Sequence, residues 1–213
     1  MGNTGLLGPK TTTVADQTMD SDYLKDHILR GNTVVHPSLP QDTPGQPTDF
    51  NFVVGADTQI GIRNKNVDWK YELDYCVRAV DYINALPTQP DFVCMCGDLV
   101  DLEPMMFEGK FGTKEECITV QRTQYSDFKE VFSKLKPDIP MVCICGNHDV
   151  GNRPTPESIE RFTSQFGDDF FAFWCKKCYM ICLNSNLYAD NSDAMEQYEK
   201  QHKWLEERLQ YAR

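Results

Sequence analysis

Long apolar runs are absent from this sequence. No stretch approaches the roughly 18 consecutive apolar residues that a membrane-spanning helix needs. The first residues also lack the basic segment followed by an apolar segment that marks a secretory signal. Basic residues are scarce, because 21 Lys and Arg stand against 32 Asp and Glu, a formal net charge of −11. Since nucleic acids and acidic membranes are bound by basic faces, the sequence predicts neither kind of partner.

A nucleotide P-loop and a disulfide framework are not indicated either. The pattern Gly-x-x-x-x-Gly-Lys-Ser/Thr does not occur. The nine cysteines are an odd number, and most of them lie inside apolar runs, where a thiol behaves as a small hydrophobic group. Free thiols are typical of proteins in a reducing compartment. We therefore expect a cytoplasmic protein.

The chain divides into a tail and one domain. Residues 1–48 are rich in Thr, Asp, Pro and Gly and show little periodicity, which is typical of a flexible N-terminal tail. From residue 49 to residue 213, strand-like and helix-like patterns alternate, which predicts an α/β domain with right-handed crossovers. The glycine-containing segment 103–113 is expected to be a loop. Strands are predicted at 50–54, 92–96, 141–145, 170–174 and 179–184, and helices at 68–86, 114–135, 156–166 and 194–213.

Three of the predicted strands end in the same way, with a glycine turn followed by oxygen-bearing side chains. Asp57, Asp98 and Asn147 lie at these turns. A single Gly-Asp after a strand is usually only a turn, but ligands of α/β sheets gather beyond the carboxyl ends of the strands. Oxygen donors suit hard or borderline divalent cations, and Asp98 is the candidate to bridge two of them. His148 could then protonate a leaving oxygen, with Asp149 holding its imidazole in place.

The three turns also resemble a known family. Gly-Ala-Asp-Thr-Gln (55–59), Gly-Asp-Leu-Val-Asp (97–101) and Gly-Asn-His-Asp (146–149) are similar to the first three motifs of the calcineurin-like metallophosphoesterases. The resemblance implies a sandwich of β-sheets flanked by helices. It also implies a phosphatase acting on phosphoserine or phosphothreonine in proteins, with two divalent cations (Mn, Fe, Zn or Mg) and an attacking hydroxide bound to them.

The same resemblance implies a role for each motif residue. Asp57 would bind the first cation, Asp98 would bridge both, and Asn147 would bind the second. His148 would act as general acid or stabilise the transition state, and Asp149 would orient it. The family usually has His two residues after the first Asp, where this chain has Gln59, whose amide oxygen is a neutral and weaker ligand.

The larger departure from the family pattern is that the histidines of its later motifs are missing from this sequence. The later family motifs supply imidazoles to both cations, but this chain has only His27, His36, His148 and His202, and none lies in such a motif. Segment 49–213 is therefore expected to hold the N-terminal two-thirds of a metallophosphoesterase domain. Two alternatives stay open: a phosphodiesterase or nucleotide phosphatase of the same fold, and a catalytically impaired form that acts only as a binding module.

Other candidate ligands are better explained by packing. Cys94, Cys96, Cys143 and Cys145 alternate on two strands expected to be neighbours, so all four could face one way. Cys-x-Cys within a strand is not the usual spacing of a zinc site, and core packing is favoured. His202 is placed on the apolar face of the last helix and is interpreted as a packed histidine.

Overall fold

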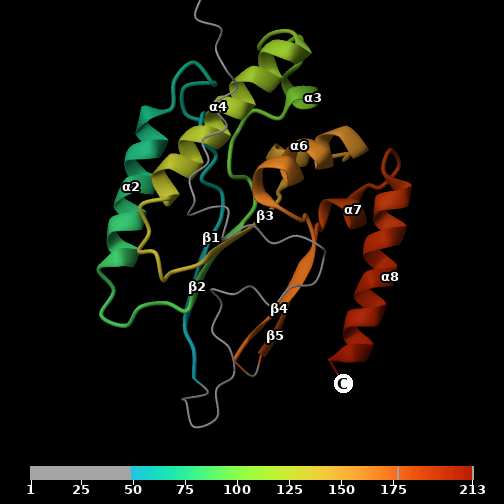
Figure 1. Cartoon of the computed structure of the whole chain (residues 1–213). Helices are drawn as coiled ribbons and strands as arrows, with labels where there is room; N and C mark the ends of the chain where they lie inside the picture. The colour runs from blue at the N-terminus through green and yellow to red at the C-terminus, as the bar shows by residue number, and fades with distance from the viewer. Residues whose placement is uncertain (1–48, 177, 213) are drawn as a thin grey trace, which may run out of the picture.

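The computed structural model describes residues 49–176 and 178–212 (Figure 1). The predicted tail, residues 1–48, lies outside the described residues. The predicted α/β architecture is confirmed. In chain order the described elements are β1 (Phe52–Gly55), α2 (Lys70–Asn84), β2 (Phe92–Cys96), α3 (Pro104–Phe107), α4 (Lys114–Phe132), β3 (Met141–Ile144), α5 (Asn147–Val150), α6 (Pro156–Phe166), β4 (Phe171–Cys175), β5 (Cys178–Cys182), α7 (Asn186–Ala189) and α8 (Met195–Tyr211).

The centre of the fold is a parallel sheet of the order β1-β2-β3. Helices α2 and α4 cover one face, and the antiparallel hairpin β4–β5 lies on the other (Figure 1). Val93 and Met95 of β2 pack with Phe128 on the helical side. Phe92 points to the hairpin side, where its ring meets Phe173 edge-on at 5.3 Å between centroids. This two-sided burial explains the continuous apolar run of β2.

The register of the sheet separates the four strand cysteines. Cys94 pairs with Val142, and Met95 pairs with Cys143, so the thiols of β2 and β3 are out of phase. Side chains at paired positions of a parallel sheet point to the same face. Cys94 therefore packs toward the hairpin, whereas Cys143 and Cys145 pack toward the helices. The expectation that all four thiols could face one way is wrong, and core packing accounts for them.

Three of the seven described helices, α3, α4 and α6, begin at a side-chain cap. The Thr155 side chain accepts a hydrogen bond from the Ser158 N–H at 3.1 Å, with Pro156 at the first helical position of α6. Thr113 and Glu116 form a reciprocal capping box at the start of α4. The segment 103–113, expected to be a loop, contains the short helix α3, which the Glu103 carboxylate caps by accepting from the Met106 N–H.

The last helix differs from its predicted packing. The His202 side chain is 49% exposed, with its ring stacked on that of Tyr198 at 5.6 Å between centroids, and Leu209 is 51% exposed. The buried position of α8 is instead Gln201, whose side chain accepts from the Asn184 N–H at 2.8 Å and donates to the Asn184 carbonyl at 3.1 Å. The predicted apolar face is therefore only partly the packed one, because Tyr198 packs against Ile159 and Leu187 while the buried contact of Gln201 is polar.

Among the described residues, no helix is long and apolar enough to cross a membrane.

Candidate metal-binding and catalytic site

The three glycine turns lie side by side at the carboxyl edge of the sheet. The Asp57 N–H donates to the Gly97 carbonyl at 3.1 Å, and the Gln59 N–H donates to the Asp98 carbonyl at 2.9 Å. The turn after β3 joins them, since the His148 N–H donates to Oδ1 of Asp98 at 2.9 Å. The fold thus gathers the predicted site residues at one edge, with Asp98 as the residue that both other turns contact.

The backbone of these turns is strained where the candidate ligands sit. Asp57, Gln59 and Asp98 have φ angles of +56°, +36° and +50°. Non-glycine residues seldom adopt such left-handed angles, which cost about 1–3 kcal/mol each and cluster at functional sites. Three of the four candidate metal ligands therefore hold a left-handed backbone conformation.

Two glycines allow the turns after β2 and β3 to approach each other. Gly97 has a φ of +82°, and a Cβ added there would lie 2.6 Å from the backbone nitrogen of Gly146. A Cβ on Gly146 would overlap the Asp98 carboxylate. The glycine in each motif is thus needed for close approach and not only for turning the chain.

The imidazole of His148 is held by Asp101. Its Nδ1 lies 2.8 Å from the Asp101 carbonyl oxygen and 3.3 Å from Oδ1 of the same residue. A carbonyl can only accept, so Nδ1 carries a proton and donates. The Asp101 carboxylate is buried and accepts from Nδ2 of Asn66 at 2.8 Å. The hydrogen bond to Asp101 raises the pKa of His148 to about 9, against the lowering effect of burial.

Asp149 has a different position from the one predicted. Its fully buried carboxylate accepts from the Gly146 N–H at 2.8 Å and from the Leu99 N–H at 3.2 Å. It therefore ties the turn after β3 to the turn after β2. Among the contacts of the described residues, the imidazole of His148 meets Asp101 and not Asp149. The expectation that Asp149 orients His148 is corrected accordingly. Burial raises the pKa of Asp149 to about 7, although the N–H donors of Gly146 and Leu99 lower it.

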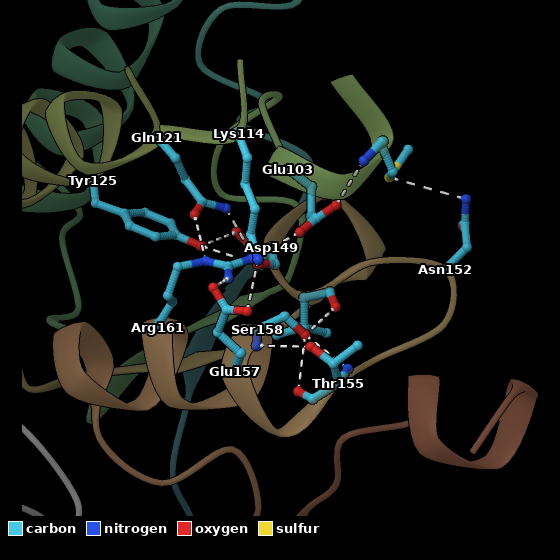
Figure 2. A network of polar contacts seen from close by, with 12 residues as sticks. Glu103, Lys114, Gln121, Tyr125, Asp149, Asn152, Thr155, Glu157, Ser158 and Arg161 are labelled. Carbon is cyan, nitrogen blue, oxygen red and sulfur yellow. Dashed lines mark hydrogen bonds and ion pairs between the residues drawn. The ribbon is translucent and has the colours of Figure 1, made fainter. Parts of the chain in front are cut away.

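A polar network from α4 and α6 supports Asp149 (Figure 2). The Asp149 carbonyl accepts from Nε2 of Gln121 at 3.3 Å and from the Tyr125 hydroxyl at 3.4 Å. Nε of Arg161 donates to Oε1 of Gln121 at 3.3 Å, and its Nη2 donates to the buried Glu103 at 2.9 Å. Burial raises the pKa of Glu103, while the charge of Arg161 opposes this effect.

Sequence reasoning missed this supporting network. Glu103 and Arg161 are separated by 58 residues, and each has an ordinary helix or loop context. Charged residues with such contexts are usually solvent-exposed. Only the tertiary fold brings the pair together, and a single sequence carries no local signal of it.

The side chains at the turns match part of a divalent cation site. Two carboxylates (Asp57, Asp98) and two amides (Gln59, Asn147) offer the oxygen donors that hard cations prefer. The turns leave these side chains at least partly exposed, as an ion entering from solvent requires. Within 49–176 and 178–212, however, no three or more His, Cys, Asp or Glu side chains group closely enough to hold a metal ion. The described donors thus form a partial set and do not complete two coordination spheres.

Comparison with known proteins decides the family. The profile of the calcineurin-like phosphoesterases matches residues 50–211. The chain belongs to this family. The metallophosphoesterase fold predicted from the three motifs is thereby confirmed, and such domains generally use divalent metals.

Several phosphatases from vertebrates are similar to this family member. It is 35% identical over 172 residues to serine/threonine-protein phosphatase CPPED1 of Danio rerio. The matched region covers 76% of this chain and 52% of the relative. The CPPED1 phosphatases of Homo sapiens and Bos taurus are 34% and 36% identical over 197 and 195 residues, covering 88% and 87% of this chain. In both cases 58% of the relative is covered. The chain therefore spans little more than half the length of these relatives.

The position of His148 predicts how its pKa responds to mutation. In the metal-free chain, Asp101→Asn is expected to lower the pKa of His148 from about 9 toward the ordinary value of 6.5, because the hydrogen bond to Asp101 is the main cause of the raised value. A titration of the imidazole by NMR measures this shift. Asp81→Asn removes the same charge from an exposed position on α2 and is the matched control, which should leave the pKa of His148 unchanged. An unchanged pKa of His148 in Asp101→Asn would show that Asp101 does not hold the imidazole.

Proposed function

We propose that this chain carries the metal-dependent core of a phosphoesterase that hydrolyses phosphomonoesters, acting on phosphoserine and phosphothreonine in proteins. The observation that carries the proposal is the meeting of three ligand-bearing turns at one edge of the parallel sheet, tied together through Asp98. The substrate class is supported by the relatives, which are named serine/threonine-protein phosphatases. A phosphorylated protein is thus the proposed partner.

The candidate ligands are assigned to two cations. Asp57 and Gln59 would hold one ion, Asn147 would hold a second, and Asp98 would face both from the middle turn. Bound divalent cations supply charge that offsets the phosphate's negative charge and that activates water. This neutralisation matters for a chain of net charge −11, which would otherwise repel its substrate.

His148 provides the proton that the leaving oxygen needs. The hydrogen bond to Asp101 raises the pKa of His148 to about 9 and so favours the protonated imidazole. Nδ1 is occupied by Asp101, and Nε2 makes no hydrogen bond within the described part of the chain. The second N–H is therefore available to donate toward a substrate oxygen. Asp101 positions this donor, and Asp149 fixes the spacing of the two turns beside it.

The cytoplasm is the compartment that we propose for this activity. All nine cysteines of the chain are free thiols in the structure, including neighbours such as Cys94 and Cys96, whose sulfur atoms lie 3.7 Å apart. Thiols at such distances persist in a reducing environment and tend to oxidise outside it. The acidic net charge further supports protein substrates over nucleic acids.

A substrate panel together with metal analysis tests the proposal. We expect the purified chain to bind Mn²⁺ and to release phosphate from a phosphoserine peptide. Faster cleavage of bis(p-nitrophenyl) phosphate would favour a phosphodiesterase, and faster cleavage of ATP would favour a nucleotide phosphatase. Metal binding without turnover of any substrate would favour a binding module. Absence of both metal binding and turnover would overturn the proposal for this chain.

A further inference from the structure

The side-chain amide of Asn147 is held by a second asparagine. Its Nδ2 group donates to Oδ1 of Asn152 at 3.0 Å. Within residues 49–176 and 178–212, no donor reaches the amide oxygen of Asn147. An amide binds a cation through its oxygen, because its NH₂ group is only a hydrogen-bond donor. The contact with Asn152 thus leaves free the atom that a metal ligand needs.

Asn152 reaches Asn147 because the chain turns at Gly151. The Gly151 N–H donates to the Asn147 carbonyl at 2.8 Å at the end of helix α5, and Gly151 has a φ of +92°. Glycine adopts such an angle without the steric strain that a Cβ brings. The segment that follows the Gly-Asn-His-Asp motif therefore places residue 152 beside residue 147.

The amide of Asn152 is itself oriented by a methionine. Its Nδ2 group lies 3.9 Å from the Sδ atom of Met106 on α3, the contact that is drawn from Asn152 in Figure 2. A thioether sulfur has no hydrogen to donate and accepts weakly. If the Asn152 amide were turned over, its oxygen would face the sulfur, and two acceptors would meet. The sulfur therefore favours the arrangement in which Asn152 turns its NH₂ group to Met106 and its oxygen to Asn147.

The helix that carries Met106 is anchored by buried charges. Glu103 is fully buried, and its carboxylate accepts from the Met106 N–H at 2.9 Å. Nη2 of Arg161 on α6 donates to the same carboxylate at 2.9 Å, and only 11% of the Arg161 side chain is exposed. Pro104 is buried at the first position of α3, where its fixed φ suits a helix start. The N-terminus of α3 is therefore tied to α6, which fixes the position of the sulfur.

The contact between the two asparagines contributes orientation more than stability. Asn152 is exposed, and a hydrogen bond between exposed side chains adds little to stability because water replaces either partner. A side-chain amide that nothing holds rotates between two opposite orientations. One of these would turn the NH₂ group of Asn147, instead of its oxygen, toward a cation. Holding the NH₂ group on Asn152 removes that orientation.

We infer that Asn152 and Met106 are positioning residues of the candidate metal site, which act through Asn147. The thioether of Met106 orients the amide of Asn152, and Asn152 orients Asn147 so that its amide oxygen is left for a divalent cation. The inference rests on the proposed function, in which Asn147 is a metal ligand. Partners that orient metal ligands commonly change metal affinity by about 10–100-fold.

Titration of variants with Mn²⁺ tests the inference. Asn152→Ala lets the Asn147 amide rotate and is expected to weaken Mn²⁺ binding about tenfold. Asn152→Asp should restore binding, because a carboxylate only accepts and so keeps the NH₂ group of Asn147. Met106→Leu removes the sulfur at similar volume and should weaken binding about threefold, as suits a weak hydrogen bond. Met105→Leu is the matched control on the same helix, where Met105 is 45% exposed, and should leave binding unchanged.

A double substitution separates orientation from charge. Asn152→Asp adds a negative charge, which attracts cations by itself. Met106→Leu should therefore change Mn²⁺ affinity in the unchanged chain but not in the Asn152→Asp background, where no amide needs to be oriented by the sulfur. In the metal-free chain, exchange of the Asn147 side-chain NH₂ hydrogens, followed by NMR, should be faster in Asn152→Ala.

The outcomes distinguish this inference from the proposed function. If the unchanged chain binds Mn²⁺ and Asn152→Ala binds it equally, the inference is overturned while the proposed function stands. The inference is also overturned if Met106→Leu acts like Met105→Leu, or if it has the same effect in the Asn152→Asp background. Absence of Mn²⁺ binding by the unchanged chain would overturn the proposed function and this inference with it. Circular dichroism shows whether each variant is folded.

Discussion

Asp98→Asn is expected to weaken Mn²⁺ binding and to reduce phosphatase activity on the order of 100-fold or more. Asp98 is the residue that both neighbouring turns contact, through its carbonyl and through Oδ1. An asparagine keeps the shape and can still accept the hydrogen bond from the His148 N–H. It removes the negative charge, which is what a bridging ligand contributes to divalent cations. A loss of 100-fold corresponds to about 2.7 kcal/mol of transition-state stabilisation.

The matched control is Asp81→Asn, which removes the same charge from an exposed position on α2. Isothermal titration with Mn²⁺ and a phosphate-release assay should both separate the two variants. If Asp98→Asn binds Mn²⁺ like the unchanged chain, the carboxylate is not a ligand. If both variants lose activity equally, the effect comes from overall charge and not from the site.

The strand ends were predictable because their chemistry is local. An apolar run, a glycine and an oxygen-bearing side chain are adjacent in sequence, and parallel strands bring their carboxyl ends to one edge whatever the details of packing. Asp57, Asp98 and Asn147 therefore lie where the sequence predicted them. The left-handed angles of Asp57 and Asp98 were not predictable, because they follow from the hydrogen bonds between turns.

The partners of His148 could not be read from sequence adjacency. Asp149 is the neighbour in the chain, but consecutive residues at the start of helix α5 project in different directions. Its carboxylate turns inward to the N–H groups of Gly146 and Leu99, while Asp101 reaches the imidazole from the turn after β2. Proximity in sequence thus predicted the wrong acid.

The packing of α8 shows that apolar periodicity does not always predict which face of a helix is buried. Apolar residues at three- and four-residue steps predict a buried face only if the surface they meet is apolar. Here Gln201 is buried against the backbone of Asn184, the Trp204 ring meets that of Phe170, and Leu209 is half exposed. The helix itself was predicted to within one residue at its start, whereas its orientation depended on a partner distant in sequence.

Asp149→Asn is expected to loosen the candidate site without replacing any proposed metal ligand. The Asp149 carboxylate accepts from the N–H groups of Leu99 and Gly146, one from each of two neighbouring turns. An asparagine offers one acceptor oxygen, while its NH₂ group would face the second N–H. The Leu99 N–H lies 3.2 and 3.3 Å from the two carboxylate oxygens, so in the variant it keeps at most one of these contacts, at a cost of about 1 kcal/mol in the free energy of unfolding. We expect Mn²⁺ affinity to fall by about tenfold as the turns separate.

Hydrogen exchange distinguishes the loss of this link between the two turns from a general loss of stability. In Asp149→Asn the amides of Leu99 and Gly146 should lose protection, while the amide of Phe128 in the fully buried core should change only as much as global stability does. Tyr125→Phe is the control, since it removes the longer contacts of the hydroxyl to the Asp149 carbonyl (3.4 Å) and to Oδ1 (3.5 Å) but keeps the carboxylate as acceptor for the Gly146 and Leu99 N–H groups. Equal loss of protection throughout the domain would reduce Asp149 to an ordinary buried polar residue. Unchanged Mn²⁺ affinity with exposed Leu99 and Gly146 amides would show that the spacing of the two turns does not control metal binding.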